Sequence, residues 1–219
     1  MLLRYKTVLK EGEAEIIEKK SRFIATVRPV KSEDEAKAFI EEMRKKYWNA
    51  THNVFAYAVG EKSELQRFSD DNEPSGTAGM PVLNVLNGEE VKNTAIVVTR
   101  YFGGTLLGTG GLVRAYGKSA KEGLAAAGVY ELVLYNRFSV CCDYHLSGKI
   151  QYDILNCGAI IEDTLYTDKV EYVILAESGE EGRLNKTIAE ASQGKCEPVA
   201  IDSGYGYVKD GKVIFPENI

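Results

Sequence analysis

Hydrophobic positions along this chain of 219 residues predict two successive groups of strands and helices. The most apolar stretch of the first group, residues 95–101, is nearly unbroken and rich in β-branched side chains, which is typical of a strand buried on both faces. Because small side chains let a helix approach a sheet closely, we expect this strand and a helix of small residues after it to form the centre of the group. The helical pattern comprises Leu112, Ala115, Tyr116, Ser119, Ala120, Gly123, Leu124 and Ala127.

Shorter elements make up the rest of the first group. Period-two alternation within residues 13–30 predicts two extended runs. Ser32 and Glu35 have the spacing of a capping box, which marks the start of an amphipathic helix. The further predicted elements are a strand at residues 53–59, its hairpin partner at 65–68, a helix from residue 78 to Gly88, and a strand at 129–135.

The second group has a different order of elements. Its pattern predicts strand, helix, strand, strand, helix and strand, the order of the ferredoxin-like plan. Asp210 and Gly211 then mark a small hairpin turn between Val208 and Val213. The predicted elements lie at residues 138–144, 146–156, 159–166, 170–176, 180–193 and 195–201.

The balance of acidic and basic residues changes at the same point in the chain as the order of the predicted elements. Residues 138–219 hold 7 Lys and Arg against 14 Asp and Glu, whereas residues 1–137 hold 20 against 18. The acidic surplus therefore belongs to the second part, and the first part is free to face a polyanion. We predict an N-terminal domain of residues 1–137 and a C-terminal domain, with a short tail, of residues 138–219.

The amino-acid composition limits the classes of protein to which this chain can belong. Hydrophobic residues make up 44% and charged residues 27% of the chain, which is ordinary for a globular protein. No stretch has the length of a membrane span or of a signal-peptide core, so we expect a cytoplasmic protein with no membrane partner. The cysteines lack C-x-x-C spacing, and we therefore expect reduced thiols, no zinc site and no cofactor. They are Cys141, Cys142, Cys157 and Cys196.

Five glycines separate the strand at 95–101 from the helix, and we call residues 103–111 the glycine loop. Glycine lets backbone N–H groups approach a ligand, and the dipole of the following helix favours negative charge. The spacing matches neither a P-loop nor the G-x-G-x-x-G dinucleotide fingerprint. The loop predicts an anion-binding site of another kind, with a tight strand-to-helix turn as the alternative. Its glycines are Gly103, Gly104, Gly108, Gly110 and Gly111.

Three cations follow the glycine loop on one face of the predicted helix. Arg114, Lys118 and Lys121 have the spacing i, i+4 and i+7, and we call them the basic stripe. Arg100 ends the preceding strand and is expected to add to the same surface. Such a surface suits the phosphates of RNA, and the alternative is a solvated helix face.

Carboxylates and hydroxyls crowd residues 69–79, which we call the acidic loop. Such oxygen atoms suit Mg²⁺ or acid–base chemistry, and the alternative is a polar turn that caps the helix starting near residue 78. A nearby histidine is either a core or turn residue or a member of the same site. We expect the acidic and glycine loops to share one face, and we assign no catalytic or metal-binding role. The candidate residues are His52, Asp70, Asp71, Glu73, Ser75 and Thr77.

Three ordered motifs of this chain resemble the IMPACT family, in its bacterial YigZ-like branch. They are FSDDNEPSGTAG at residues 68–79, VTRYFGG at 98–104 and LGTGGLVRAY at 107–116. Asp71-Asn72 stands where members often have Asp-Gly, and asparagine also tolerates the left-handed conformation that glycine adopts.

The resemblance implies an α+β fold of two domains. The first is an α/β sandwich of the type seen in domain IV of elongation factor G, and the second is a ferredoxin-like βαββαβ domain. Eukaryotic members regulate translation by competing with a translational-control kinase for its activator protein. The resemblance thus favours a translation-linked regulatory protein that binds RNA, the ribosome or a protein partner in translation control.

An enzyme is the alternative function. A hydrolase would act on a small phosphorylated or peptide substrate at the cleft between the acidic and glycine loops. Some bacterial members of the family carry a proline-dipeptidase label, but this sequence lacks the paired metal-binding carboxylates and histidines of a metallopeptidase.

Overall fold

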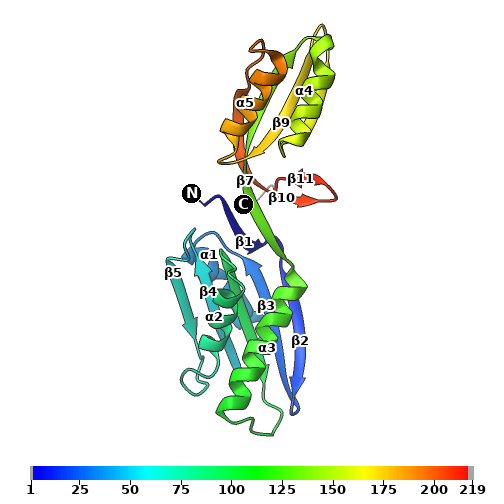
Figure 1. Ribbon diagram of the computed structural model, residues 1–219. Coiled ribbons are helices and arrows are strands. Elements are labelled where there is room, and N and C mark those ends of the chain that lie inside the picture. Colours follow the sequence, from blue (N-terminus) through cyan, green and yellow to red (C-terminus); the bar gives the residue numbers. More distant parts are fainter. Residues whose placement is uncertain (1, 217–219) are drawn as a thin grey trace. The chain divides into compact units, whose positions relative to one another are not determined.

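The computed structural model describes residues 2–216, which form two compact units of an α+β fold (Figure 1). The first unit is Tyr5–Glu131, and the second contains residues 2–4 and 132–216. Each unit is built on an antiparallel sheet. Within residues 2–216, no helix combines the length and the apolar character needed to cross a membrane.

The first unit contains a five-stranded sheet with the order β2-β3-β6-β4-β5. The central strand, β6, pairs with β3 on one side and β4 on the other, so both of its edges are bonded. This position explains its apolar sequence, because helices cover both faces of the sheet. The strands are β2 (Gly12–Glu18), β3 (Ser21–Pro29), β4 (His52–Val59), β5 (Leu65–Ser69) and β6 (Thr94–Tyr101).

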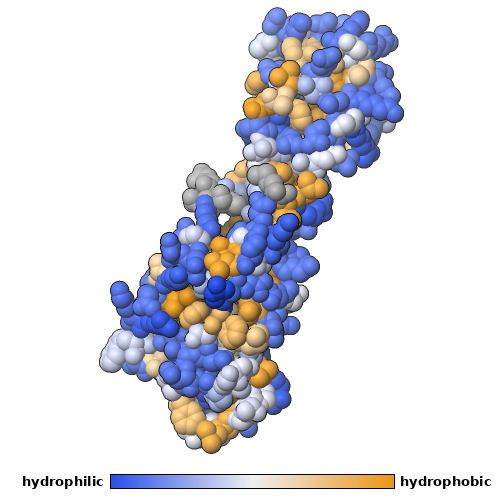
Figure 2. Space-filling model, turned by 90° about the vertical axis from the view of Figure 1, so that its left-hand side faces the viewer, coloured by the Kyte–Doolittle hydropathy of each residue, from blue (hydrophilic) through white to orange (hydrophobic). Residues whose placement is uncertain are grey.

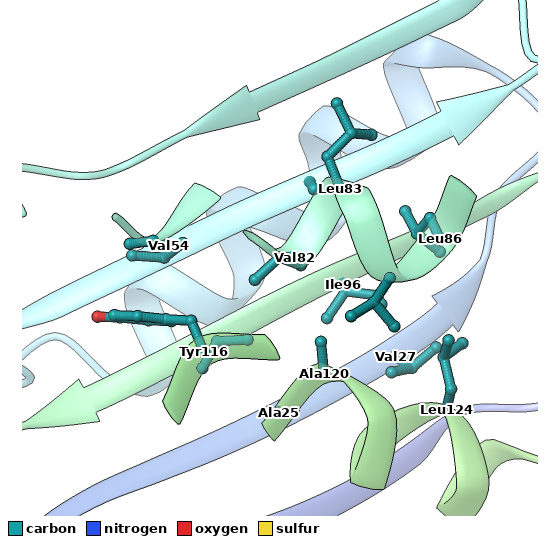
Figure 3. Close-up of a cluster of buried hydrophobic side chains, with 14 of the residues drawn as sticks. Ala25, Val27, Val54, Val82, Leu83, Leu86, Ile96, Tyr116, Ala120 and Leu124 are labelled. Carbon is teal, nitrogen blue, oxygen red and sulfur yellow. The ribbon is translucent and has the colours of Figure 1, made fainter. Parts of the chain in front are cut away.

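Two hydrophobic cores lie on opposite faces of this sheet. Ile96 and Val98 of β6 pack with α2 (Gly79–Gly88) and α3 (Thr109–Ala127), whereas Ala95 and Val97 pack with α1 (Glu33–Lys46). Figure 3 shows the first of these cores, where side chains of α2 and α3 meet over the sheet.

Small residues bring α3 close to the sheet, as the sequence predicts. A Cβ atom on Gly123 would lie 2.8 Å from the Cβ of Ala25 and 3.0 Å from a methyl group of Val27. A larger residue at position 123 would therefore push the helix away from β3.

The second unit has the ferredoxin-like fold that the sequence predicts. Its strands lie in the order β10-β7-β9-β8, and α4 and α5 contribute Ile150, Ile154, Leu184 and Ile188 to its core. A two-residue turn at Asp210 and Gly211 joins β10 to β11. The elements are β7 (Val129–Cys142), α4 (Tyr144–Asn156), β8 (Ile160–Tyr166), β9 (Val170–Glu177), α5 (Glu181–Ser192), β10 (Val199–Lys209) and β11 (Lys212–Ile214).

Three elements differ from the prediction. β1 (Arg4–Val8) is an additional strand, and β7 is one strand of 14 residues where the pattern predicted two. The strand predicted at residues 195–201 begins only at Val199, directly after Pro198, which has no N–H to donate to a ladder.

The predicted boundary between residues 137 and 138 falls inside β7 and stays a prediction. Because each unit has its own core, limited proteolysis is expected to leave stable fragments of about the size of one unit, with ends before the part of β7 that pairs with β9 and β10. Degradation without any stable fragment of that size would contradict it.

Candidate functional site

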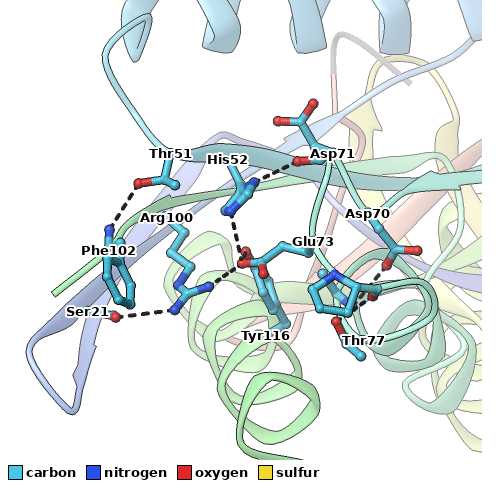
Figure 4. Close-up of polar contacts among 12 residues, drawn as sticks. Ser21, Thr51, His52, Asp70, Asp71, Glu73, Thr77, Arg100, Phe102 and Tyr116 are labelled. Carbon is cyan, nitrogen blue, oxygen red and sulfur yellow. Dashed lines mark hydrogen bonds and ion pairs between the residues drawn. The ribbon is translucent and has the colours of Figure 1, made fainter. Parts of the chain in front are cut away.

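The acidic and glycine loops meet at one cavity of the first unit, so they share a face as expected. The cavity has a volume of about 430 Å³. Figure 4 shows the polar residues around it, which come from the start of β4, the acidic loop, the end of β6 and α3. The lining residues are Thr51, His52, Glu73, Pro74, Arg100, Phe102, Leu106, Leu107, Gly108, Thr109 and Leu112.

A buried ion pair lies at this cavity. Arg100 is 5% exposed and Glu73 is 8% exposed, and Arg100 Nη1 donates a hydrogen bond to Glu73 Oε1. The hydroxyl of Tyr116 donates to the same oxygen at 2.7 Å. Burial, together with the negative charge of Glu73, raises the pKa of Tyr116 far above its usual value. Tyr116 therefore stays protonated and serves as a permanent donor to Glu73.

Arg100 does not add to the surface of the basic stripe, because it is buried. Its Nη2 lies 3.4 Å from Ser21 Oγ, and its guanidinium lies 5.3 Å from the ring of Phe23 and 5.6 Å from that of Phe102. The remaining nitrogen, Nε, is buried without a hydrogen-bond partner in residues 2–216. A buried donor without a partner is energetically costly.

His52 is oriented by the backbone of the acidic loop. Its Nδ1 lies 2.7 Å from the carbonyl oxygen of Asp71. A carbonyl oxygen only accepts, so Nδ1 carries a proton. The other ring nitrogen, Nε2, is 3.7 Å from Glu73 Oε1, and His52 lines the cavity. Nε2 thus offers the cavity a lone pair when the ring is neutral and an N–H when it is charged.

The other carboxylates of the acidic loop hold its backbone. Asp70 accepts hydrogen bonds from the N–H groups of Gly76, Ala78 and Gly79, and it thereby caps the start of α2. Asp71 accepts from the backbone N–H of Asn53 at 2.6 Å. The capping interpretation of the loop is therefore confirmed for Asp70.

Loop geometry explains the remaining candidates of the acidic loop. Asp71 and Asn72 have φ angles of 43° and 68°, so Asn72 adopts the left-handed conformation expected of it. Thr77 Oγ1 donates to the carbonyl of Pro74 at 2.6 Å, and Ser75 is exposed. In the described part of the chain, no group of three or more His, Cys, Asp or Glu side chains is placed to hold a metal ion.

The glycine loop leaves the start of α3 open. Gly108 precedes the helix with a φ angle of 73°, and it offers no side chain to cap the first N–H groups. The first backbone bond of the helix runs from the N–H of Leu112 to the carbonyl of Gly108. The N–H groups before Leu112 have no acceptor within the helix and carry the positive end of its dipole. Of the five glycines of the loop, Gly108 lines the cavity, whereas Gly103, Gly104, Gly110 and Gly111 lie outside its lining.

The basic stripe is a separate feature on the exposed face of α3. Arg114, Lys118 and Lys121 are all exposed, and none of them lines the cavity. Lys121 lies 3.9 Å from Glu89. Among the described residues, no ion pair joins Arg114 or Lys118 to a carboxylate.

Several residues of the site were not identified from the sequence, among them Tyr116, Thr109 and Leu106. Tyr116 belongs to an apolar helical stripe, and nothing in the sequence indicates that its hydroxyl meets Glu73. Thr109 and Leu106 line the cavity beside glycines. An apolar residue within a predicted loop, Leu106, was the one signal of these that the sequence offered. In the structure Leu106 is 83% exposed.

Comparison with known proteins gives two family matches. The Impact N-terminal domain matches residues 19–124, and a domain of unknown function (DUF1949) matches residues 140–195. The chain is 41% identical to the IMPACT family member YvyE of Bacillus subtilis over 99% of this chain and 95% of that protein. It is 34% identical to the IMPACT family member YigZ of Escherichia coli over 84% of this chain and 91% of that protein.

Two further matches concern a eukaryotic relative and a solved structure. Protein IMPACT of Rattus norvegicus is 36% identical over 43% of this chain and 31% of its own length. A crystal structure of a hypothetical protein has 31% sequence identity and a TM-score of 0.58, and it covers 92% of this chain and 99% of its own.

Proposed function

The chain belongs to the bacterial branch of the IMPACT family, and from this premise we propose that it is a translation-linked regulatory protein that binds RNA, free or in the ribosome. The observation that carries this proposal is the pair of exposed cations, Arg114 and Lys118, one helical turn apart on α3. No carboxylate of the described residues competes for either of them.

Phosphate binding follows from the chemistry of these two side chains. The guanidinium of Arg114 presents a planar fork that matches two oxygens of one phosphate, and Lys118 presents a compact positive charge. Contacts to phosphates hold an RNA without reading its sequence, and they release counterions. The proposed surface therefore binds RNA with a strong dependence on salt.

The hydrolase alternative has less support from the geometry. Asp70 and Asp71 accept backbone hydrogen bonds, and Glu73 is engaged by Arg100 and Tyr116. The three carboxylates of the acidic loop thus have partners within the fold, which suits a structural role more than general acid or base catalysis.

Reversing the charge at both positions tests the proposal. The double variant Arg114→Glu, Lys118→Glu is expected to weaken RNA binding and to lower the salt slope by about two, one for each lost phosphate contact. Fluorescence polarisation of a labelled single-stranded RNA, titrated at several salt concentrations, measures both quantities. Both side chains are exposed, so the melting temperature should stay close to that of the parent.

A matched control lies on the opposite face of the same sheet. The variant Lys31→Glu, Lys45→Glu changes the net charge by the same amount at the two ends of α1, and both side chains are exposed. It should leave the salt slope unchanged if binding depends on the basic stripe. Equal binding of RNA by the parent and the α3 variant at low salt would show that the stripe is only a solvated helix face.

A further inference from the structure

Three elements bring polar groups to the cavity. The open start of α3 reaches it at Gly108 and Thr109, and His52 places Nε2 at it from β4. Arg100, from the end of β6, also lines the cavity and is 5% exposed, and its Nε has no partner in the described part of the chain.

Among the described residues that line the cavity, Glu73 is the one carboxylate, and its charge does not cancel the positive potential at the start of α3. Glu73 is already paired with Arg100 and accepts a hydrogen bond from Tyr116, which stays protonated. The ion pair is close to neutral as a unit, so the helix dipole decides the sign of the local potential. The cavity therefore favours an anion.

Apolar side chains form the rim of the same cavity. Phe102 is 46% exposed and Leu106 is 83% exposed, although both are large and hydrophobic. Figure 2 shows hydrophobic surface at the lower end of the first unit, where Figure 1 places the loop between β6 and α3. One exposed aromatic ring at the rim offers a stacking surface for a flat group.

We propose that this cavity binds the phosphate group of a nucleotide at the start of α3, with the base stacked on Phe102 beside Leu106. The volume of about 430 Å³ falls within the range of small-molecule sites, roughly 300–1,000 Å³. The phosphate accepts hydrogen bonds from the backbone N–H and the hydroxyl of Thr109, at the positive end of the dipole of α3. The phosphate belongs either to a free mononucleotide or to the end of an RNA strand. In the second case the site deepens the proposed RNA-binding function.

Thr109 allows a test that preserves the fold. It occupies the first position of α3, where aspartate is favourable to the helix dipole. The variant Thr109→Asp places a carboxylate where the phosphate would lie and should weaken binding by about tenfold or more. The matched variant Thr109→Asn has nearly the same shape as Thr109→Asp without the charge, so the difference in affinity between the two variants isolates the effect of the charge. Neither variant should lower the melting temperature.

The experiment is a calorimetric titration of the full chain and both variants. The probes are adenosine 5′-monophosphate, adenosine, and a short single-stranded RNA with a 5′-phosphate or a 5′-hydroxyl end. The proposal expects the monophosphate or the phosphorylated RNA to bind more tightly than its counterpart without phosphate. Binding of the monophosphate identifies a free nucleotide as the source, and binding of the phosphorylated RNA alone identifies a strand end.

Different results would contradict the cavity proposal and the proposed function of RNA binding by the basic stripe. The variant Arg114→Glu, Lys118→Glu should retain binding of the monophosphate, because neither residue lines the cavity. Two results would overturn the cavity proposal: no preference for the phosphorylated probes in the parent, or equal affinity of Thr109→Asp and Thr109→Asn. Loss of RNA binding in the α3 variant would support the basic stripe in either case.

Discussion

Replacing Glu73 with alanine is expected to lower the free energy of unfolding of the first unit by about 3–5 kcal/mol. The side chains of Arg100 and Glu73 are only 6% and 4% exposed. Removing the carboxylate leaves a buried guanidinium without its counterion and the hydroxyl of Tyr116 without its acceptor. Urea denaturation followed by circular dichroism measures the change.

An exposed ion pair of the same unit provides the control. Glu41 and Arg44 pair on α1 with side chains that are 57% and 40% exposed, and the change Glu41→Ala should cost less than about 1 kcal/mol. Adding Arg100→Met to the Glu73→Ala variant removes the uncompensated charge and should restore part of the lost stability. A cost of Glu73→Ala no larger than that of Glu41→Ala would show that the buried pair contributes nothing of its own.

The local pattern of hydrophobic residues was sufficient to predict most of the fold. The run that became β6 and the small-residue face of α3 are properties of neighbouring residues, and their periods identify them without tertiary information. The βαββαβ order likewise identified the ferredoxin-like unit. These predictions are confirmed because a strand buried on both faces is rich in apolar residues, and a helix that packs closely on a sheet has small residues on one face.

Strand β7 shows why other elements were mispredicted. Asn136 and Arg137 interrupt the hydrophobic pattern and resemble a break between two strands. In the structure Arg137 remains within the strand, because it pairs with Glu162 of β8 and Asp202 of β10. Those partners lie 25 and 65 residues away, so no local pattern could reveal them.

The site was harder to predict for the same reason. Asp70, Asp71 and Glu73 are three similar acids in one loop, and the sequence offers no means of telling their roles apart. Their partners decide those roles: backbone N–H groups for the two aspartates, and Arg100 with Tyr116 for Glu73. Arg100 itself ends a strand, a position that is as compatible with exposure as with burial. Only the tertiary fold shows that it lies under Phe102.

The change Gly103→Ala is expected to destabilise the first unit by about 1–3 kcal/mol or more. A Cβ atom at this position would lie 2.1 Å from the backbone carbonyl carbon of Lys20 and 2.2 Å from its oxygen. Backbone atoms cannot move aside as a flexible side chain does, so the glycine loop and the β2–β3 turn would have to separate. The N–H of Gly103 would then lose its hydrogen bond of 3.1 Å to Ser21 Oγ, an oxygen that Arg100 also contacts.

Gly117→Ala is the matched control, because it makes the same chemical change within α3. A Cβ atom on Gly117 would meet nothing within 4 Å, and alanine is the better helix former by roughly 0.5–1 kcal/mol. Thermal unfolding of the two variants should therefore move the transition in opposite directions, down for Gly103→Ala and up for Gly117→Ala. If both variants melted together with the parent, close contact between the glycine loop and the β2–β3 turn would not be a source of stability.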